Sequence, residues 1–94
     1  MTVEEERKLP LDIEEIEALA KMAVSRRIPG EIKEIVVESS DLREIGGLLI
    51  YELSGHAIIV VKPKTFLRPE RTIRRYWLAK FEATTGKLVS FKLS

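Results

Sequence analysis

The fold is decided by the stretch LDIEEIEALAKMAVSRR, residues 11–27. Its apolar residues recur every three or four positions, which predicts an α-helix with one apolar face and one charged face. Asp12 and Glu15 have the spacing of a capping box at the start of this helix. Arg26 and Arg27 are expected in its last turn, where positive charge interacts favourably with the helix dipole. We therefore expect one amphipathic helix near the N-terminus.

After this helix the pattern changes to that of β-strands. Short apolar runs rich in β-branched residues occupy residues 35–37, 48–53 and 57–61. The dipeptide Ser54-Gly55, between the last two runs, predicts a tight two-residue hairpin loop. Residues 41–45 are expected to form one helical turn.

A second hairpin is predicted at the C-terminal end. Residues 72–83 alternate between two faces, and the turn residues 84–86 separate them from a second alternating run, 89–93. One face of the first run carries Trp77, Ala79 and Phe81, and the other carries Tyr76, Leu78, Lys80 and Glu82.

One amphipathic helix followed by adjacent antiparallel strands predicts two packed layers, with the apolar face of the sheet against the helix. The expected fold is therefore α+β, with an N-terminal amphipathic helix on a four- to five-stranded antiparallel sheet. The predicted core combines residues from the matching faces: Ile16, Ala20, Ala23, Trp77, Phe81, Val89 and Phe91.

The segments IVVE (35–38), GLLIYE (47–52) and WLAKFEATTGKLV (77–89), in this order after a helix, resemble PepSY-type, cystatin-like modules. The resemblance covers most of the chain by order of elements, and its local motif is a strand, a Thr-Gly turn and a strand. The PepSY turn usually carries an acidic residue where this chain has Ala83 or Thr84, and that family is typically extracytoplasmic. The resemblance implies a cystatin-like roll with a non-catalytic, partner-binding role, and it transfers no functional residue.

Composition sets further limits. The chain has 94 residues, 45% hydrophobic and 33% charged, which predicts a single domain over 1–94 with a flexible tail at 1–8. No run reaches the roughly 18 apolar residues that span a membrane, and the N-terminus is acidic, so we expect a cytoplasmic protein. Asn, Gln and Cys are absent, a composition typical of hot environments, which predicts a thermophilic, archaeal source.

Residue types that usually carry catalysis or bind metals are scarce. Cysteine is absent and His56 is the only histidine, which removes thiolate chemistry and most histidine-based metal sites. No nucleophile motif accompanies His56, and Gly46-Gly47 lacks the Lys and Ser/Thr of a phosphate-binding loop. We therefore expect no enzyme activity, no cofactor, no metal site and no small-molecule substrate, and we expect His56 to be a plain hairpin residue.

Charge is segregated along the chain although its net charge is only +1. Residues 1–20 contain seven acidic and two basic residues, whereas residues 62–75 contain six basic residues and one acidic residue. Phe66, Tyr76 and Trp77 lie in or beside this basic segment. Sites for single-stranded nucleic acid combine such cations, which neutralise phosphates, with rings that stack on bases. The alternative is that the arginines protect a strand edge and Trp77 belongs to the core.

The same segment also predicts a protein interface. Phe66 and Leu67 lie between Pro63 and Pro69, where exposing two large apolar side chains to water would be unfavourable. If a second copy covers them, the acidic helix of one protomer can meet the basic segment of the other. We favour a non-catalytic protein-interaction module that forms a homodimer or binds another protein, and nucleic-acid binding is the alternative. The candidate interaction residues for either role are Lys62, Lys64, Phe66, Leu67, Arg68, Arg71, Arg74 and Arg75.

Overall fold

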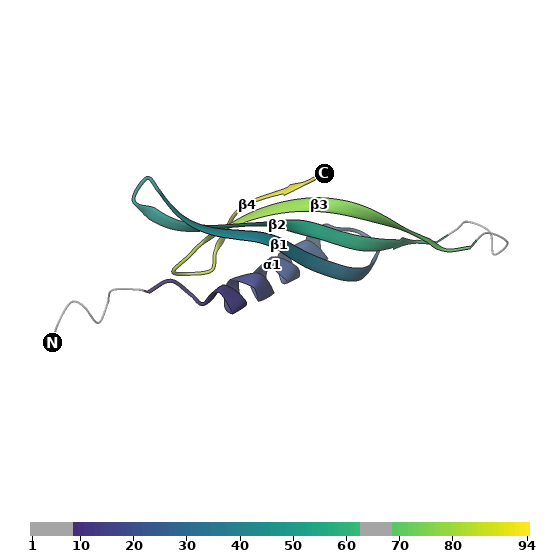
Figure 1. The fold of residues 1–94 in the computed structure, drawn as a ribbon, viewed down its shortest axis with the longest axis horizontal. Coiled ribbons are helices and arrows are strands. Elements are labelled where there is room, and N and C mark those ends of the chain that lie inside the picture. Colours follow the sequence, from purple (N-terminus) through teal and green to yellow (C-terminus); the bar gives the residue numbers. More distant parts are fainter. Residues whose placement is uncertain (1–8, 63–68) are drawn as a thin grey trace.

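The computed structural model describes residues 9–62 and 69–94. The expected tail at 1–8 lies outside this part of the chain. The elements are, in order, α1 (Ile13–Arg27), β1 (Glu31–Ile45), β2 (Leu48–Val61), β3 (Arg71–Glu82) and β4 (Leu88–Leu93). Each strand pairs antiparallel with the next, giving one sheet in the order β1-β2-β3-β4. The helix lies across one face of this sheet (Figure 1), so the predicted α+β fold with an N-terminal helix on an antiparallel sheet is confirmed.

The helix begins and ends where the sequence predicts. Glu15 accepts a hydrogen bond from the backbone N–H of Asp12 at 3.4 Å within a capping box, and Arg26 and Arg27 occupy the last turn. The segment that leads into the helix is fixed to the sheet, because Leu11 donates its N–H to Ala83 O at 2.8 Å and accepts a hydrogen bond from the Tyr51 hydroxyl at 3.1 Å. Hydrogen bonds therefore hold the start of the helix at one position on the sheet.

Two local predictions for β1 and β2 are wrong. Residues 41–45 do not form a helical turn; they continue β1, which pairs with β2 from Glu31↔Val60 to Ile45↔Leu48. Ser54-Gly55 does not form a hairpin loop but lies in the middle of β2. The turn is at Gly46 and Gly47, whose φ angles of +60° and +84° fit the type I′ geometry that a two-residue hairpin requires. The two apolar runs on either side of Ser54-Gly55 therefore form one strand, β2, and the sheet has four strands.

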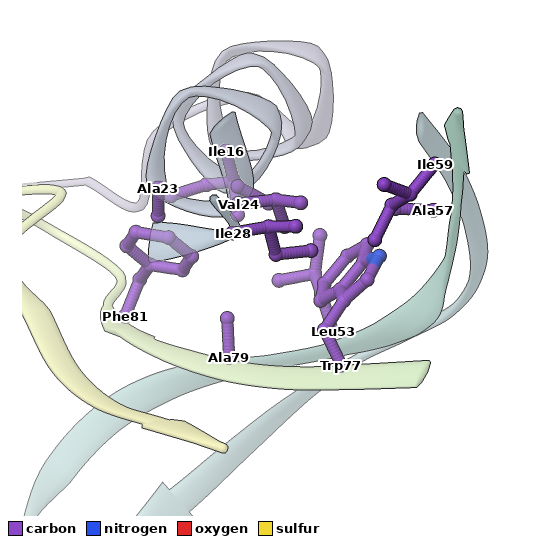
Figure 2. Packing of buried hydrophobic residues seen from close by; sticks show 11 residues of the cluster. Ile16, Ala23, Val24, Ile28, Leu53, Ala57, Ile59, Trp77, Ala79 and Phe81 are labelled. Carbon is purple, nitrogen blue, oxygen red and sulfur yellow. The ribbon is translucent and has the colours of Figure 1, made fainter. Parts of the chain in front are cut away.

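The core lies between the helix and the facing side of the sheet (Figure 2). Phe81 and Trp77 are each 2% exposed, and they pack with Ile16, Ala20 and Ala23 of the helix in one cluster, as predicted. The two alanines let the helix approach the sheet closely enough for the large aromatic side chains of β3 to fill the space between the layers.

Val89 is the exception among the predicted core residues, because it is 56% exposed. On β3, Phe81 pairs with Leu88 and Lys80 pairs with Ser90, so Val89 is the extra residue of a β-bulge. The bulge shifts the alternation of β4 by one position, and Leu88 takes the place against the core that the sequence assigned to Val89.

Candidate protein-interaction surface

The face of the sheet that points away from α1 is called here the open face. On the central strand β2 it comprises Ile50, Glu52, Ser54, His56, Ile58 and Val60, which alternate with the core-facing residues. The residues paired with them on β1 and β3 lie on the same face. Within residues 9–62 and 69–94, no helix or strand packs on this face (Figure 1).

The centre of the open face is apolar. This apolar centre consists of five side chains: Val36 of β1 and Tyr76 of β3, which are both paired with His56, Leu78 of β3, which is paired with Ser54, and Ile58 and Val60 of β2. Four of these side chains are partly buried by their neighbours, and Tyr76 is 49% exposed. Polar side chains lie among them, since Ile58 is paired with Glu34 and with Arg74. Aliphatic and aromatic side chains on an uncovered sheet face are typical of a surface that binds another protein.

His56 lies at the middle of this surface and is held in place by two neighbours. Its Nδ1 is 3.0 Å from Glu38 Oε2, and its ring meets the ring of Tyr76 edge to face at a centroid distance of 6.2 Å. Glu38 reaches His56 because it is the extra residue of a β-bulge between Val37 and Ser39. This pair could not be predicted, because the bulge that brings Glu38 to His56 has no signal in the sequence.

The His56–Glu38 pair has the arrangement of a histidine oriented by a carboxylate. No hydroxyl group in the described part of the chain forms a hydrogen bond with His56, so it has no nucleophile to activate there. The side chain of His56 is only 12% exposed and lies in a strand, so the prediction of a plain hairpin residue is wrong. His56 is a polar side chain among the apolar side chains of the open face, and it contacts Glu38 and Tyr76.

Beyond the apolar centre, the open face carries a network of charged side chains. Glu52 of β2 forms ion pairs with Arg43 of β1 at 3.4 Å and with Lys80 of β3 at 3.7 Å. Arg43 also lies 3.8 Å from Asp41. Ion pairs this exposed contribute little to stability. They place both acidic and basic groups at defined positions on the open face.

The predicted basic segment does not form one patch in the part of the chain that the structure covers. Lys62 forms an ion pair with Glu31 at 3.4 Å. Arg74 is exposed on the open face, whereas Arg75 is on the side of the helix and donates from Nε to the carbonyl oxygen of Ser94 at 3.1 Å. Arg71 is exposed at the start of β3. Strand alternation thus sends neighbouring arginines to opposite faces.

The other predicted interaction residues are Lys64, Phe66, Leu67 and Arg68, and these lie outside the described residues. The dimer contact expected at Phe66 and Leu67 therefore stays a prediction. Among the residues whose positions are given, no three His, Asp or Glu side chains converge where they could hold a metal ion. The one helix of this region is too short and too polar to cross a membrane.

No protein-family model, no curated protein and no solved structure matches the chain. The fold, the open face and the charges around it are therefore the observations from which a function can be proposed.

Proposed function

We propose that the protein is a non-catalytic protein-interaction module that self-associates through the open face of its sheet. The observation that carries this proposal is the uncovered apolar centre around Ile58, with Tyr76 49% exposed beside it. Covering such side chains removes apolar surface from water, which is the main favourable contribution to protein association. The charged residues around the centre supply the polar rim of a specific interface.

A second copy of the chain is the partner that the surface suits best. Its acidic and basic residues are divided between β1 and β3, the strands on either side of β2. On the open face, β1 carries four acidic residues and one basic residue, and β3 carries two basic residues and one acidic residue. A surface with one sign on one side and the opposite sign on the other can be complementary to itself after a two-fold rotation.

Nucleic-acid binding, the alternative that the sequence suggests, has weaker support. A strand of phosphates needs a continuous run of cations on one surface. Arg74 and Arg75 are on opposite faces, Lys62 pairs with Glu31, and the acidic Glu34 lies on the same face as Arg74. Trp77, one of the three rings available for stacking, is 2% exposed in the core.

Other parts of the proposal rest on the sequence alone. The absence of Asn, Gln and Cys supports an origin in a hot environment, and a thermal midpoint above about 90 °C is the expected measurement. The archaeal source, the cytoplasmic location and the resemblance to PepSY-type, cystatin-like modules stay predictions.

The test of self-association is the molar mass in solution, measured by light scattering over a range of protein concentrations. The wild type is expected to be a dimer. Ile58→Glu places a charge at the apolar centre and is expected to give a monomer with an unchanged circular dichroism spectrum. Met22→Glu is the matched control, because Met22 is 47% exposed on the helix, away from the open face. A wild type that stays monomeric at all concentrations contradicts the proposal.

A further inference from the structure

We propose that the second copy docks on the open face with its two-fold axis parallel to the strands, so that β1 of each protomer lies over β3 of the other and Glu34 pairs with the partner's Arg74. This inference rests on the proposed self-association and specifies its geometry. It follows from how charges are arranged across the strands, and it assigns an intermolecular role to two residues that have no ion-pair partner within residues 9–62 and 69–94.

Two orientations are available to a symmetric face-to-face pair of sheets with aligned strands. If the axis runs along the strands and over β2, the order of the strands across the sheet is reversed in the partner, and β1 faces the partner's β3. If the axis runs across the strands, the order of the strands is the same in both protomers, and β1 faces the partner's β1. Rotation about an axis leaves the position along that axis unchanged, so in the first orientation each residue meets the partner's residues from the same level of the sheet.

The charges at three levels of the open face distinguish these orientations. A level here means three residues paired side by side on β1, β2 and β3, and the three levels are Glu34–Ile58–Arg74, Asp41–Glu52–Lys80 and Arg43–Ile50–Glu82. At each level the residues on β1 and β3 have opposite charges. At the third level the basic residue is on β1 and the acidic residue is on β3, the reverse of the other two levels. The two residues still have opposite charges, so they remain complementary across the interface.

With the axis along the strands, β1 and β3 bring opposite charges together across the interface at all three levels. Strand β2 faces its own copy, which places Glu52 opposite the partner's Glu52, and within each protomer Arg43 and Lys80 are paired with this carboxylate. With the axis across the strands, the acidic β1, which has a net charge of minus three, would face its own copy. Like charges placed opposite one another disfavour that arrangement. The charge pattern therefore selects the axis that runs along the strands.

Glu34 and Arg74 give the sharpest probe of this geometry. They are the direct neighbours of Ile58 on β1 and β3, so each lies one strand away from the axis that runs over β2. Asp41, Arg43 and Lys80 already take part in ion pairs within the protomer, whereas Glu34 and Arg74 are both exposed. Exchanging their charges should leave the fold of the protomer unchanged.

The experiment is sedimentation velocity at low ionic strength on the wild type, Glu34→Arg, Arg74→Glu and the double variant. Each single variant places like charges opposite each other twice per dimer, so the dissociation constant should rise by at least about tenfold. The double variant, and an equimolar mixture of the two single variants, should restore dimers because opposite charges meet again. Lys21→Glu is the control, since it reverses an exposed charge on the helix and should have no effect.

The outcomes separate this inference from the proposal on which it rests. Single variants that dimerise as tightly as the wild type, or more tightly, show that the axis does not run along the strands, while self-association itself stands. Failure of the mixture and of the double variant to recover overturns the Glu34–Arg74 pair in the same way. A monomeric wild type removes both the proposed function and the orientation.

Discussion

Gly55 lies directly against the indole of Trp77, its partner across β2 and β3. A Cβ atom on Gly55 would be 2.9 Å from Cζ2 of Trp77 and 1.9 Å from the carbonyl oxygen of Val36. The absence of a side chain therefore lets the largest ring of the core lie close to the backbone of β2, next to the bulge in β1 between Val37 and Ser39. The glycine that looks like a turn residue in the sequence is required for packing.

We predict that Gly55→Ala destabilises the fold by about 1–3 kcal/mol or more, because the added methyl group forces the Trp77 ring and the backbone of β1 to move. Urea denaturation followed by tryptophan fluorescence measures both the free energy of unfolding and the environment of the ring. Ser54→Ala is the control, since this neighbour lies on the open face and should change the free energy by no more than about 0.5 kcal/mol. Equal stability of Gly55→Ala and wild type would show that the close contact is not present.

Phe81 and Val89 provide a second matched comparison. Phe81→Ala should cost about 3–5 kcal/mol, because it leaves a cavity between the helix and the sheet. Val89→Ala should cost no more than about 0.5 kcal/mol, because the bulge leaves Val89 56% exposed. Denaturation midpoints of the two variants test the shifted alternation of β4. Similar losses in both variants would mean that Val89 belongs to the core after all.

For nucleic acid, we predict that fluorescence anisotropy detects no saturable binding of single-stranded or duplex oligonucleotides at low salt, because the arginines of β3 are divided between two faces. Arg74→Ala/Arg75→Ala tests any residual signal. Binding that weakens steeply with salt and is lost in this double variant would favour the nucleic-acid alternative over the protein interface.

The parts of the fold that follow from local signals could be predicted from the sequence. The helix has its periodicity, its capping box and its C-terminal arginines within a single stretch, and the alternation of Trp77, Ala79 and Phe81 is equally local. Residues 41–45 and Gly55 were interpreted wrongly because their conformation is set by the strand beside them. Leu42 is paired with Tyr51, and Gly55 is paired with Trp77. Neither contact can be predicted from the residues that are adjacent in the sequence.

The candidate site was harder to predict for the same reason. The sequence shows a basic segment, but strand alternation divides it, and β-bulges displace Val89 and bring Glu38 to His56. The open face becomes apparent only when Val36, His56 and Tyr76 are placed side by side by the register of three strands. Such a surface is a property of pairing between distant segments.

The most direct test of the central claim, that a second copy covers the open face, uses the absence of cysteine in the chain. Single-cysteine variants Tyr76→Cys and Met22→Cys are compared, because these positions are 49% and 47% exposed in the protomer but lie on the open face and on the helix, respectively. The rate of thiol labelling at position 76 should fall as the protein concentration rises from low to high micromolar, while the rate at position 22 stays constant. Labelling rates that are independent of concentration at both positions would contradict the account.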